Sequence, residues 1–270
     1  MNKKLIKAAV IGALFSVAPM SFAADEVEDV KAPSSMLDEF SFSANVGLYS
    51  DYIFRGYTQT QGEPAIQGGF DVEHSSGLYV GTWASNVDWT TAGGFMDKNS
   101  IEVDVYGGWA TELPFGGIGF DIGVLQFLYP GDDTADAVET DATEVYVGLS
   151  KDFMDGRFSV SLTNYVVVSD DAWGFSNMDG ETYTDLSVDV PIGSTPITLS
   201  AHVGYQTFGD QGDGEDYDYT DWKLNADYAF NDNFSAGAFY TDTDQKKDNW
   251  TVAGEFLGDS AFGGYISAGF

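Results

Sequence analysis

The sequence predicts a transmembrane, antiparallel, up-and-down β-barrel of about 12 strands, with 14 strands as the alternative. Apolar and polar residues alternate with a period of two over most of the chain after Phe40, which gives each strand one apolar and one polar face. Short turns alternate with longer polar loops, and the composition combines 32 glycines and 15% aromatic residues with no cysteine. Without disulfides, an exported chain must be held by burial or by a closed hydrogen-bonded sheet.

Residues 1–23 have the pattern of a cleaved secretory signal peptide. Three lysines precede an apolar run over residues 8–17, and small residues follow at Ser21 and Ala23. The run is shorter than the roughly 20 residues that a membrane-spanning helix needs. Export through such a peptide, followed by insertion of a barrel, would place the protein in the bacterial outer membrane.

The barrel is expected to occupy residues 40–270, after a flexible, acidic periplasmic segment at 24–39 that has no apolar period. Alternation marks each expected strand, although the facing of 77–88 and 233–242 is less clear. In chain order, the expected strands lie in 40–55, 66–73, 77–88, 101–109, 118–124, 144–150, 157–168, 185–190, 197–206, 221–230, 233–242 and 261–270.

The connections alternate in length, as in membrane barrels with short periplasmic turns and long external loops. A soluble sandwich needs no such asymmetry, and a lipocalin-like barrel would have an apolar interior. A further spanning strand at 249–258 would give an odd count, whereas bacterial barrels have even counts. We therefore expect 243–261 to be an extended external loop. The expected turns are 74–77, 113–117, 153–157, 191–195 and 230–233, and the other expected loops are 56–62, 89–98, 129–142, 170–181 and 208–217.

Two runs near the start of the barrel carry a family motif: VGLYSDYIFRGYTQTQGEPAIQGGFDV (46–72) and SGLYVGTWASNVD (76–88). They resemble the start of the TorF-type porins, also called the Gcw_chp family, which begin with similar S-D-Y-x-F-R-G-x-x-Q, P-A-x-Q-G and G-x-Y-x-G-T-W-x-S-N runs. The later hairpins and the terminal Phe270 follow the same layout. The resemblance implies an outer-membrane barrel with porin function.

For a channel, the deciding chemistry is the charge inside the barrel. If the apolar parity faces lipid, the polar parity faces the lumen, where carboxylates attract cations and repel anions. The whole chain carries 43 Asp+Glu against 11 Lys+Arg, a net charge of −32, which argues against nucleic-acid partners. The expected pore-lining residues are Asp51, Arg55, Gln67, Asp71, Glu73, Glu102, Asp104, Asp121, Glu144, Arg157, Asp185, Asp189, His202, Asp221, Lys223 and Asp227.

Arg55 is one of few cations and lies in a stretch predicted to continue the first strand. Asp51 precedes it by about 13 Å along a strand, which is too far for direct contact. We expect Arg55 to join an ion network inside the barrel near its outer rim, with Asp71 or Glu102 as its partner. A substrate-binding role is the alternative.

Acidic loops at 129–142 and 208–221 match no EF-hand pattern. We expect solvated loops. The alternative is weak binding of Ca²⁺ or Mg²⁺, bridging to lipopolysaccharide phosphates, and no other cofactor is expected.

The sequence contains no G-x-S-x-G, H-E-x-x-H or phosphate-loop motif, so we expect no enzyme activity. His202 and Ser200 on one strand face are the one arrangement that suggests nucleophilic catalysis. We predict a porin, a passive, cation-preferring diffusion channel for small polar or cationic solutes that contacts outer-membrane lipid and lipopolysaccharide. The alternatives are a filled structural or adhesive barrel and an outer-membrane hydrolase. The sequence does not determine the oligomeric state.

Overall fold

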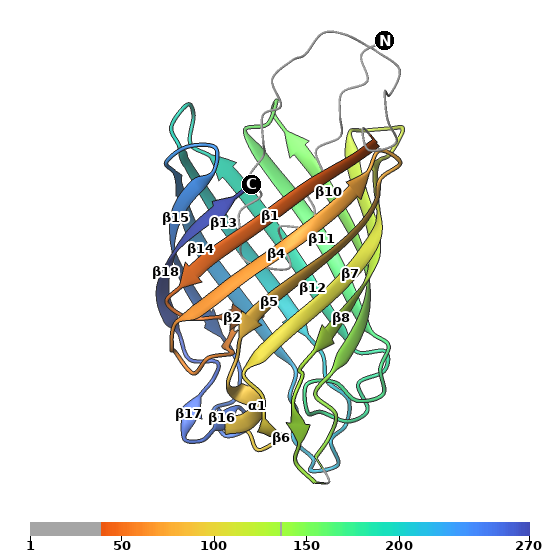
Figure 1. Ribbon diagram of the computed structural model, residues 1–270, viewed down its shortest axis with the longest axis vertical. Helices are drawn as coiled ribbons and strands as arrows, with labels where there is room; N and C mark the ends of the chain where they lie inside the picture. The colour runs from red at the N-terminus through yellow and green to blue at the C-terminus, as the bar shows by residue number, and fades with distance from the viewer. Residues whose placement is uncertain (1–38, 136) are drawn as a thin grey trace.

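The structure is a closed antiparallel barrel of twelve strands, as predicted (Figure 1). The computed structural model describes residues 39–135 and 137–270, so the expected signal peptide and almost all of the expected flexible segment lie outside the described residues. Neighbours in the chain pair, and β1 closes the barrel by pairing with β18. The barrel strands are β1 (Phe40–Tyr49), β4 (Ala65–His74), β5 (Leu78–Asn86), β7 (Ile101–Glu112), β8 (Ile118–Leu128), β10 (Ala142–Phe153), β11 (Phe158–Val167), β12 (Thr182–Pro191), β13 (Ile197–Gln206), β14 (Tyr219–Ala229), β15 (Phe234–Thr243) and β18 (Ala261–Gly269).

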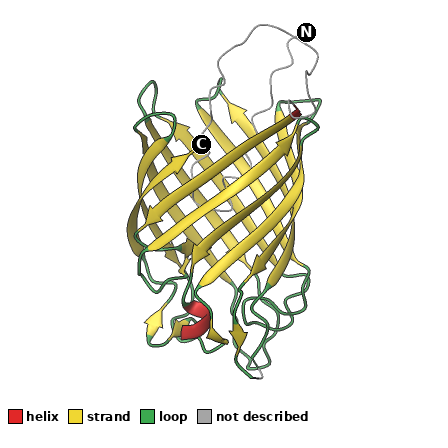
Figure 2. Ribbon diagram, viewed as in Figure 1, coloured by secondary structure: helices red, strands yellow, loops and turns green. Residues whose placement is uncertain are grey.

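Short turns and long loops lie at opposite ends of the barrel (Figure 2). All of the expected short turns lie at the end where β1 begins and β18 ends, here called the turn end. The longer connections lie at the opposite end, the loop end, and include α1 (Trp89–Ala92), β6 (Met96–Lys98) and β9 (Asp132–Asp133). Within residues 39–135 and 137–270, no helix has the length and apolar character to cross a membrane.

The connection between β15 and β18 is a loop, not a thirteenth spanning strand. It carries only the two-residue strands β16 (Thr251–Val252) and β17 (Glu255–Phe256), which pair with each other. Both lie beyond the barrel wall at the loop end (Figure 1). The expectation of twelve spanning strands with an extended loop here is confirmed.

Large apolar side chains cover the outside of the barrel. Leu48, Ile66, Leu78 and Ile266 are exposed by 54%, 58%, 58% and 57%. Leu48, Ile66 and Ile266 occupy the parity that the sequence predicts to face lipid, and Leu78 resolves the facing of a strand that the sequence left unclear. A wide apolar band is costly in water and favourable against hydrocarbon, so the outer surface matches that of a membrane barrel.

Tyrosine rings on the inner face lie over glycines of neighbouring strands. A Cβ atom on Gly123 would come within 3.0 Å of the Tyr146 hydroxyl, and one on Gly204 would do the same at Tyr183. Glycine usually weakens a strand, but here it makes room for a buried ring. The same arrangement pairs Tyr79 with Gly108, Tyr106 with Gly81 and Tyr265 with Gly237.

The first strand is shorter than the sequence predicts. β1 ends at Tyr49, and the chain then leaves the wall and turns into the barrel, although the alternation continues to residue 55. Tyr52 and Phe54 were therefore wrongly expected to face lipid, because both are buried in the interior. Spacing alone does not distinguish a strand in the wall from a chain that has left it.

Replacing Gly123 with alanine is expected to destabilise the barrel by about 1–3 kcal/mol, because the added methyl group overpacks the interior against Tyr146 and the carbonyl oxygen of Gly107. Urea unfolding in lipid vesicles, followed by tryptophan fluorescence, measures the change. Gly264→Ala is the control, since its methyl group would lie 3.2 Å from the oxygen of Gly237. Equal destabilisation by both substitutions would contradict the ring-over-glycine packing.

Candidate functional site

A small hairpin fills the loop end of the barrel. Between β1 and β4, β2 (Ile53–Phe54) pairs with β3 (Tyr57–Thr58), and we call residues 51–60 the inner hairpin. Apart from Ile53, every residue from 52 to 60 is buried. The amide of Gln59 donates to the carbonyl of Tyr52 at 2.8 Å, which closes the base of the hairpin.

Arg55 and Gly56 form the tip of the inner hairpin. Their φ angles are +46° and +86°, as in the two-residue type I′ turns that suit tight hairpins. A Cβ atom on Gly56 would lie 2.5 Å from side-chain carbons of Asp221 and Thr243, so the tip is pressed against β14 and β15. The turn therefore projects Arg55 across the interior instead of along the wall.

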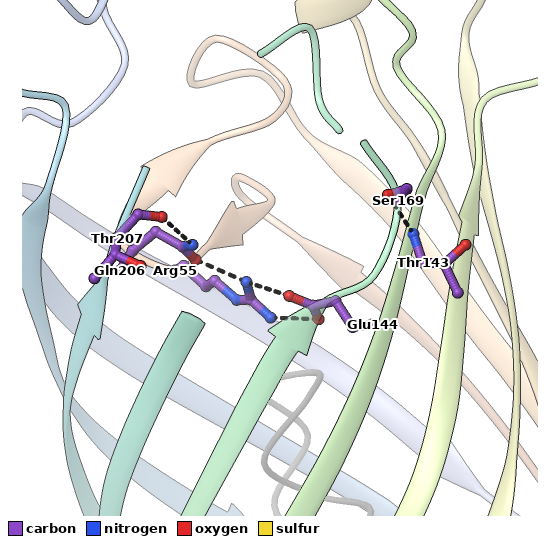
Figure 3. A network of polar contacts seen from close by, with 6 residues as sticks. All are labelled: Arg55, Thr143, Glu144, Ser169, Gln206 and Thr207. Carbon is purple, nitrogen blue, oxygen red and sulfur yellow. Dashed lines mark hydrogen bonds and ion pairs between the residues drawn. The ribbon is translucent and has the colours of Figure 1, made fainter. Parts of the chain in front are cut away.

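The guanidinium of Arg55 binds two strands of the wall (Figure 3). It donates to both carboxylate oxygens of Glu144 on β10, at 2.9 and 2.7 Å, and to the side-chain oxygen of Gln206 on β13 at 2.8 Å. Its carbon centre also lies 4.2 Å from the ring centroid of Tyr183. One side chain thus ties the inner hairpin to β10, β12 and β13.

The pair of Arg55 and Glu144 is buried, with side chains 5% and 0% exposed. In such a pair, the loss of hydration offsets much of the electrostatic attraction. The pair therefore contributes more to fixing one arrangement of the hairpin than to the net stability of the fold. The expected partners of Arg55 were wrong, because Asp71 accepts from Tyr106 and Glu102 accepts from Tyr52. Arg55 reaches farther strands because it lies on a hairpin inside the barrel and not on β1.

Most inward carboxylates accept hydrogen bonds from hydroxyl groups. Such bonds lower the cost of confining many acids in one space, since a charged acceptor forms the stronger class of hydrogen bond. Ser187 donates to Asp185 at 2.5 Å and Ser200 to Asp189 at 2.6 Å. The tyrosine donors are Tyr52 to Glu102 (2.7 Å), Tyr79 to Asp121 (2.7 Å), Tyr106 to Asp71 (2.5 Å), Tyr183 to Asp221 (3.1 Å) and Tyr265 to Asp227.

The expected pore-lining residues divide into three groups. Asp51 and Arg55 belong to the inner hairpin, where Asp51 accepts from Thr58 at 2.6 Å. Arg157 was wrongly placed in the lumen, because β11 begins at Phe158 and leaves Arg157 exposed in the turn before it. The rest lie on the inward parity of the wall: Gln67, Asp71, Glu73, Glu102, Asp104, Asp121, Glu144, Asp185, Asp189, His202, Asp221, Lys223 and Asp227.

His202 and Ser200 have separate partners. The Nδ1 atom of His202 lies 2.9 Å from Asp185, and its Nε2 atom lies 3.7 Å from Asp221. Ser200 instead donates to Asp189. The two residues therefore do not form the hydrogen-bonded pair that a serine nucleophile and its base require.

Aromatic side chains from the β11–β12, β13–β14 and β15–β18 connections and from the start of β14 form an aromatic cap, which contacts Tyr57 of the inner hairpin. Trp250 is 5% exposed and lies at its centre, with ring centroids 5.4 Å from Tyr57 and 5.3 Å from Phe208. We expected the loop at 208–221 to be solvated and did not predict the cap, although the aromatic residues of these loops were a usable signal. The remaining members are Phe175, Tyr217 and Tyr219.

No group of three or more His, Asp or Glu side chains in residues 39–135 and 137–270 is arranged to hold a metal ion. One residue of the loop at 129–142 lies outside the described residues. In the loop at 208–221, the Asp213 carboxylate accepts from the amide of Glu215, and this bond is the main cause that lowers its pKa. Backbone amides therefore satisfy part of this acidic loop.

One family model and several solved porin and channel structures match the chain. A family model described as a bacterial protein of unknown function, Gcw_chp, matches residues 33–270, whereas the narrower TorF-type label is not confirmed. No curated protein matches the sequence. The NanC porin is 14% identical with a TM-score of 0.54, covering 85% of this chain and 99% of its own. The COG4313 outer membrane channel from Pseudomonas putida F1 is 11% identical with a TM-score of 0.51, covering 89% and 99%.

Arg55→Ala is expected to lower the free energy of unfolding by about 3–5 kcal/mol, because it leaves Glu144 buried without its cation. Lys98→Ala is the matched control. It breaks an ion pair with Asp132 whose side chains are 79% and 66% exposed, and such pairs contribute little. Urea unfolding in vesicles compares the two variants, and similar losses would contradict the role given to burial.

Trp250→Ala is expected to loosen the aromatic cap while the barrel stays folded, because Trp250 joins rings from separate loops. Limited proteolysis should then cut residues 207–218 and 244–260 at least tenfold faster than in the wild type. Phe115→Ala, at an exposed turn-end position, is the control. Unchanged cleavage at the loop end would show that the cap does not hold these loops.

Proposed function

The chain belongs to the Gcw_chp family, and from this membership and the barrel fold we propose that it is an outer-membrane porin. In this proposal the protein is a passive diffusion channel for small polar solutes that prefers cations. Its apolar outer band would contact outer-membrane lipid and lipopolysaccharide. The acidic loops would be solvated, with weak binding of Ca²⁺ or Mg²⁺ at the external face as the alternative.

The charge of the interior is the observation that carries the proposal. Two cations, Arg55 and Lys223, lie buried among the described inward residues, and Arg55 is already bound to Glu144. They face seven buried carboxylates, which lie in a confined space of low dielectric. Such a space focuses a negative potential and raises the local concentration of cations. The buried acids are Glu102, Asp104, Asp121, Glu144, Asp185, Asp221 and Asp227.

The lumen is packed unevenly along its length. At the loop end, Glu102, Glu144 and Asp221 are at most 1% exposed beneath the inner hairpin. Asp71 and Asp189, closer to the turn end, are only half-buried. These features support a channel that narrows from the turn end towards the inner hairpin, which forms its constriction.

The dense packing at the loop end also favours a second candidate, a filled structural or adhesive barrel without an open pore. Both candidates share the fold and differ in whether ions pass the inner hairpin. The hydrolase alternative receives no comparable support, since Ser200 and His202 bind different partners.

Planar-bilayer recordings of the refolded protein in a KCl gradient test the proposal. We expect discrete conductance steps and a reversal potential that favours K⁺ over Cl⁻, because acids dominate the lumen. A reversal potential favouring Cl⁻ would contradict the selectivity.

A hairpin-replacement variant separates the two candidates. Because the amide of Gln59 bonds to the carbonyl of Tyr52, an Asn-Gly turn can replace residues 53–58 and keep the base of the hairpin. We expect a severalfold larger conductance in this variant. If both the wild type and the variant are silent, the filled barrel is the better description.

A further inference from the structure

We propose that Asp104 and Glu102, on β7 beneath the inner hairpin, bind the primary ammonium group of a small solute. The inference names a substrate class and rests on the proposed channel function for the route by which the solute arrives. It rests on the absence of hydrogen-bond partners at Asp104, in which Asp104 differs from every other buried acid among the described residues.

Asp104 is a buried carboxylate without a hydrogen-bond partner among the residues that the structure describes. The residue is 0% exposed, and neither of its carboxylate oxygens has a hydrogen-bond partner within the described structure. By contrast, Glu144 binds Arg55, and Asp185 accepts a hydrogen bond from Ser187 and lies 2.9 Å from the Nδ1 atom of His202. The other buried acids each accept from a tyrosine: Glu102 from Tyr52, Asp121 from Tyr79, Asp221 from Tyr183 and Asp227 from Tyr265.

A buried charge without a partner costs several kcal/mol, so this arrangement needs a counter-charge or a donor. A proton alone would cancel the charge and still leave both oxygens without a partner. The two buried cations of the described chain are engaged elsewhere, Arg55 with Glu144 and Gln206, and Lys223 over the ring of Phe239 at 4.5 Å. No partner for Asp104 therefore remains among residues 39–135 and 137–270, and we assign that role to a bound solute.

The surroundings of Asp104 favour an organic cation. Trp83 on β5 and Phe127 on β8 stand directly opposite Asp104 in the two neighbouring strands. The inner hairpin covers both rings, with Tyr52 at 5.3 Å from Trp83 and Phe54 at 5.6 Å from Phe127 between ring centroids. Aromatic faces attract cations, and they favour an alkylammonium with its apolar alkyl group over a hydrated metal ion.

The number of ligands also separates an ammonium group from a metal ion. The described residues form no group of three or more acidic or histidine side chains able to hold a metal. Glu102 lies two positions from Asp104 on the same strand face, so two carboxylates are the available anionic ligands. A primary ammonium has three donors and can be satisfied by two carboxylates and one further acceptor.

Binding can be measured without conduction, using refolded full-length protein in detergent micelles. Methylammonium chloride is titrated against NaCl at equal ionic strength, and the thermal unfolding midpoint is recorded. We expect a saturable rise in the midpoint with methylammonium. Tetramethylammonium, which has no N–H donor, should raise the unfolding midpoint little or not at all.

Asp104→Asn should weaken methylammonium binding at least tenfold. Asp132→Asn, which removes the same charge at an exposed site outside the lumen, should leave binding unchanged. Asp104→Thr provides the same test if the asparagine variant does not show the heat-shifted mobility of a folded barrel on a gel. Glu102→Gln should weaken binding severalfold.

The inference is overturned if the wild type shows no saturable binding or if Asp104→Asn binds as tightly as the wild type. Equal responses to methylammonium and tetramethylammonium, or an equal loss in Asp132→Asn, would also overturn it. A silent bilayer recording with intact methylammonium binding would count against the channel and not against this site. Ion conduction without methylammonium binding would count against this site and not against the channel.

Discussion

Closure of the barrel is the constraint on which the other features depend. In hydrocarbon, each unpaired backbone amide or carbonyl costs several kcal/mol, so a sheet in a membrane cannot keep an open edge. β1 removes the edge by pairing with β4 on one side and β18 on the other. Closure also sends alternate residues into a confined interior, and it is this confinement that makes the inward charges expensive.

Inside the barrel, most carboxylates accept hydrogen bonds from hydroxyl groups. Tyrosines on neighbouring strands reach the carboxylates, and glycines beneath their rings make the necessary space. Arg55 is the exception, since it carries a full positive charge to Glu144 from a hairpin that enters the barrel. The same side chains therefore fill the barrel and supply hydrogen bonds to its carboxylates, which couples the shape of the lumen to its charge.

The local sequence pattern was sufficient to predict the strands of the barrel wall. It was insufficient to predict the segments that fold into the barrel interior. Alternation of Leu186 and Val188 with Asp185 and Ser187 predicted β12 correctly, because a period of two directly sets which side each residue faces. The same rule failed at Tyr52, where the parity continues after the chain has left the sheet. It failed again at Arg157, where alternation runs on into a turn.

The fold class, the strand number, the difference between turns and loops and the acidity of the lumen could all be read from period, spacing and composition, which are local properties of the chain. The partner of Arg55, the aromatic cap and the isolation of Asp104 could not. Each depends on residues that meet only after closure, as Arg55 and Gln206 do across 151 positions. Spacing does not record which of several inward acids a folded-in side chain will reach.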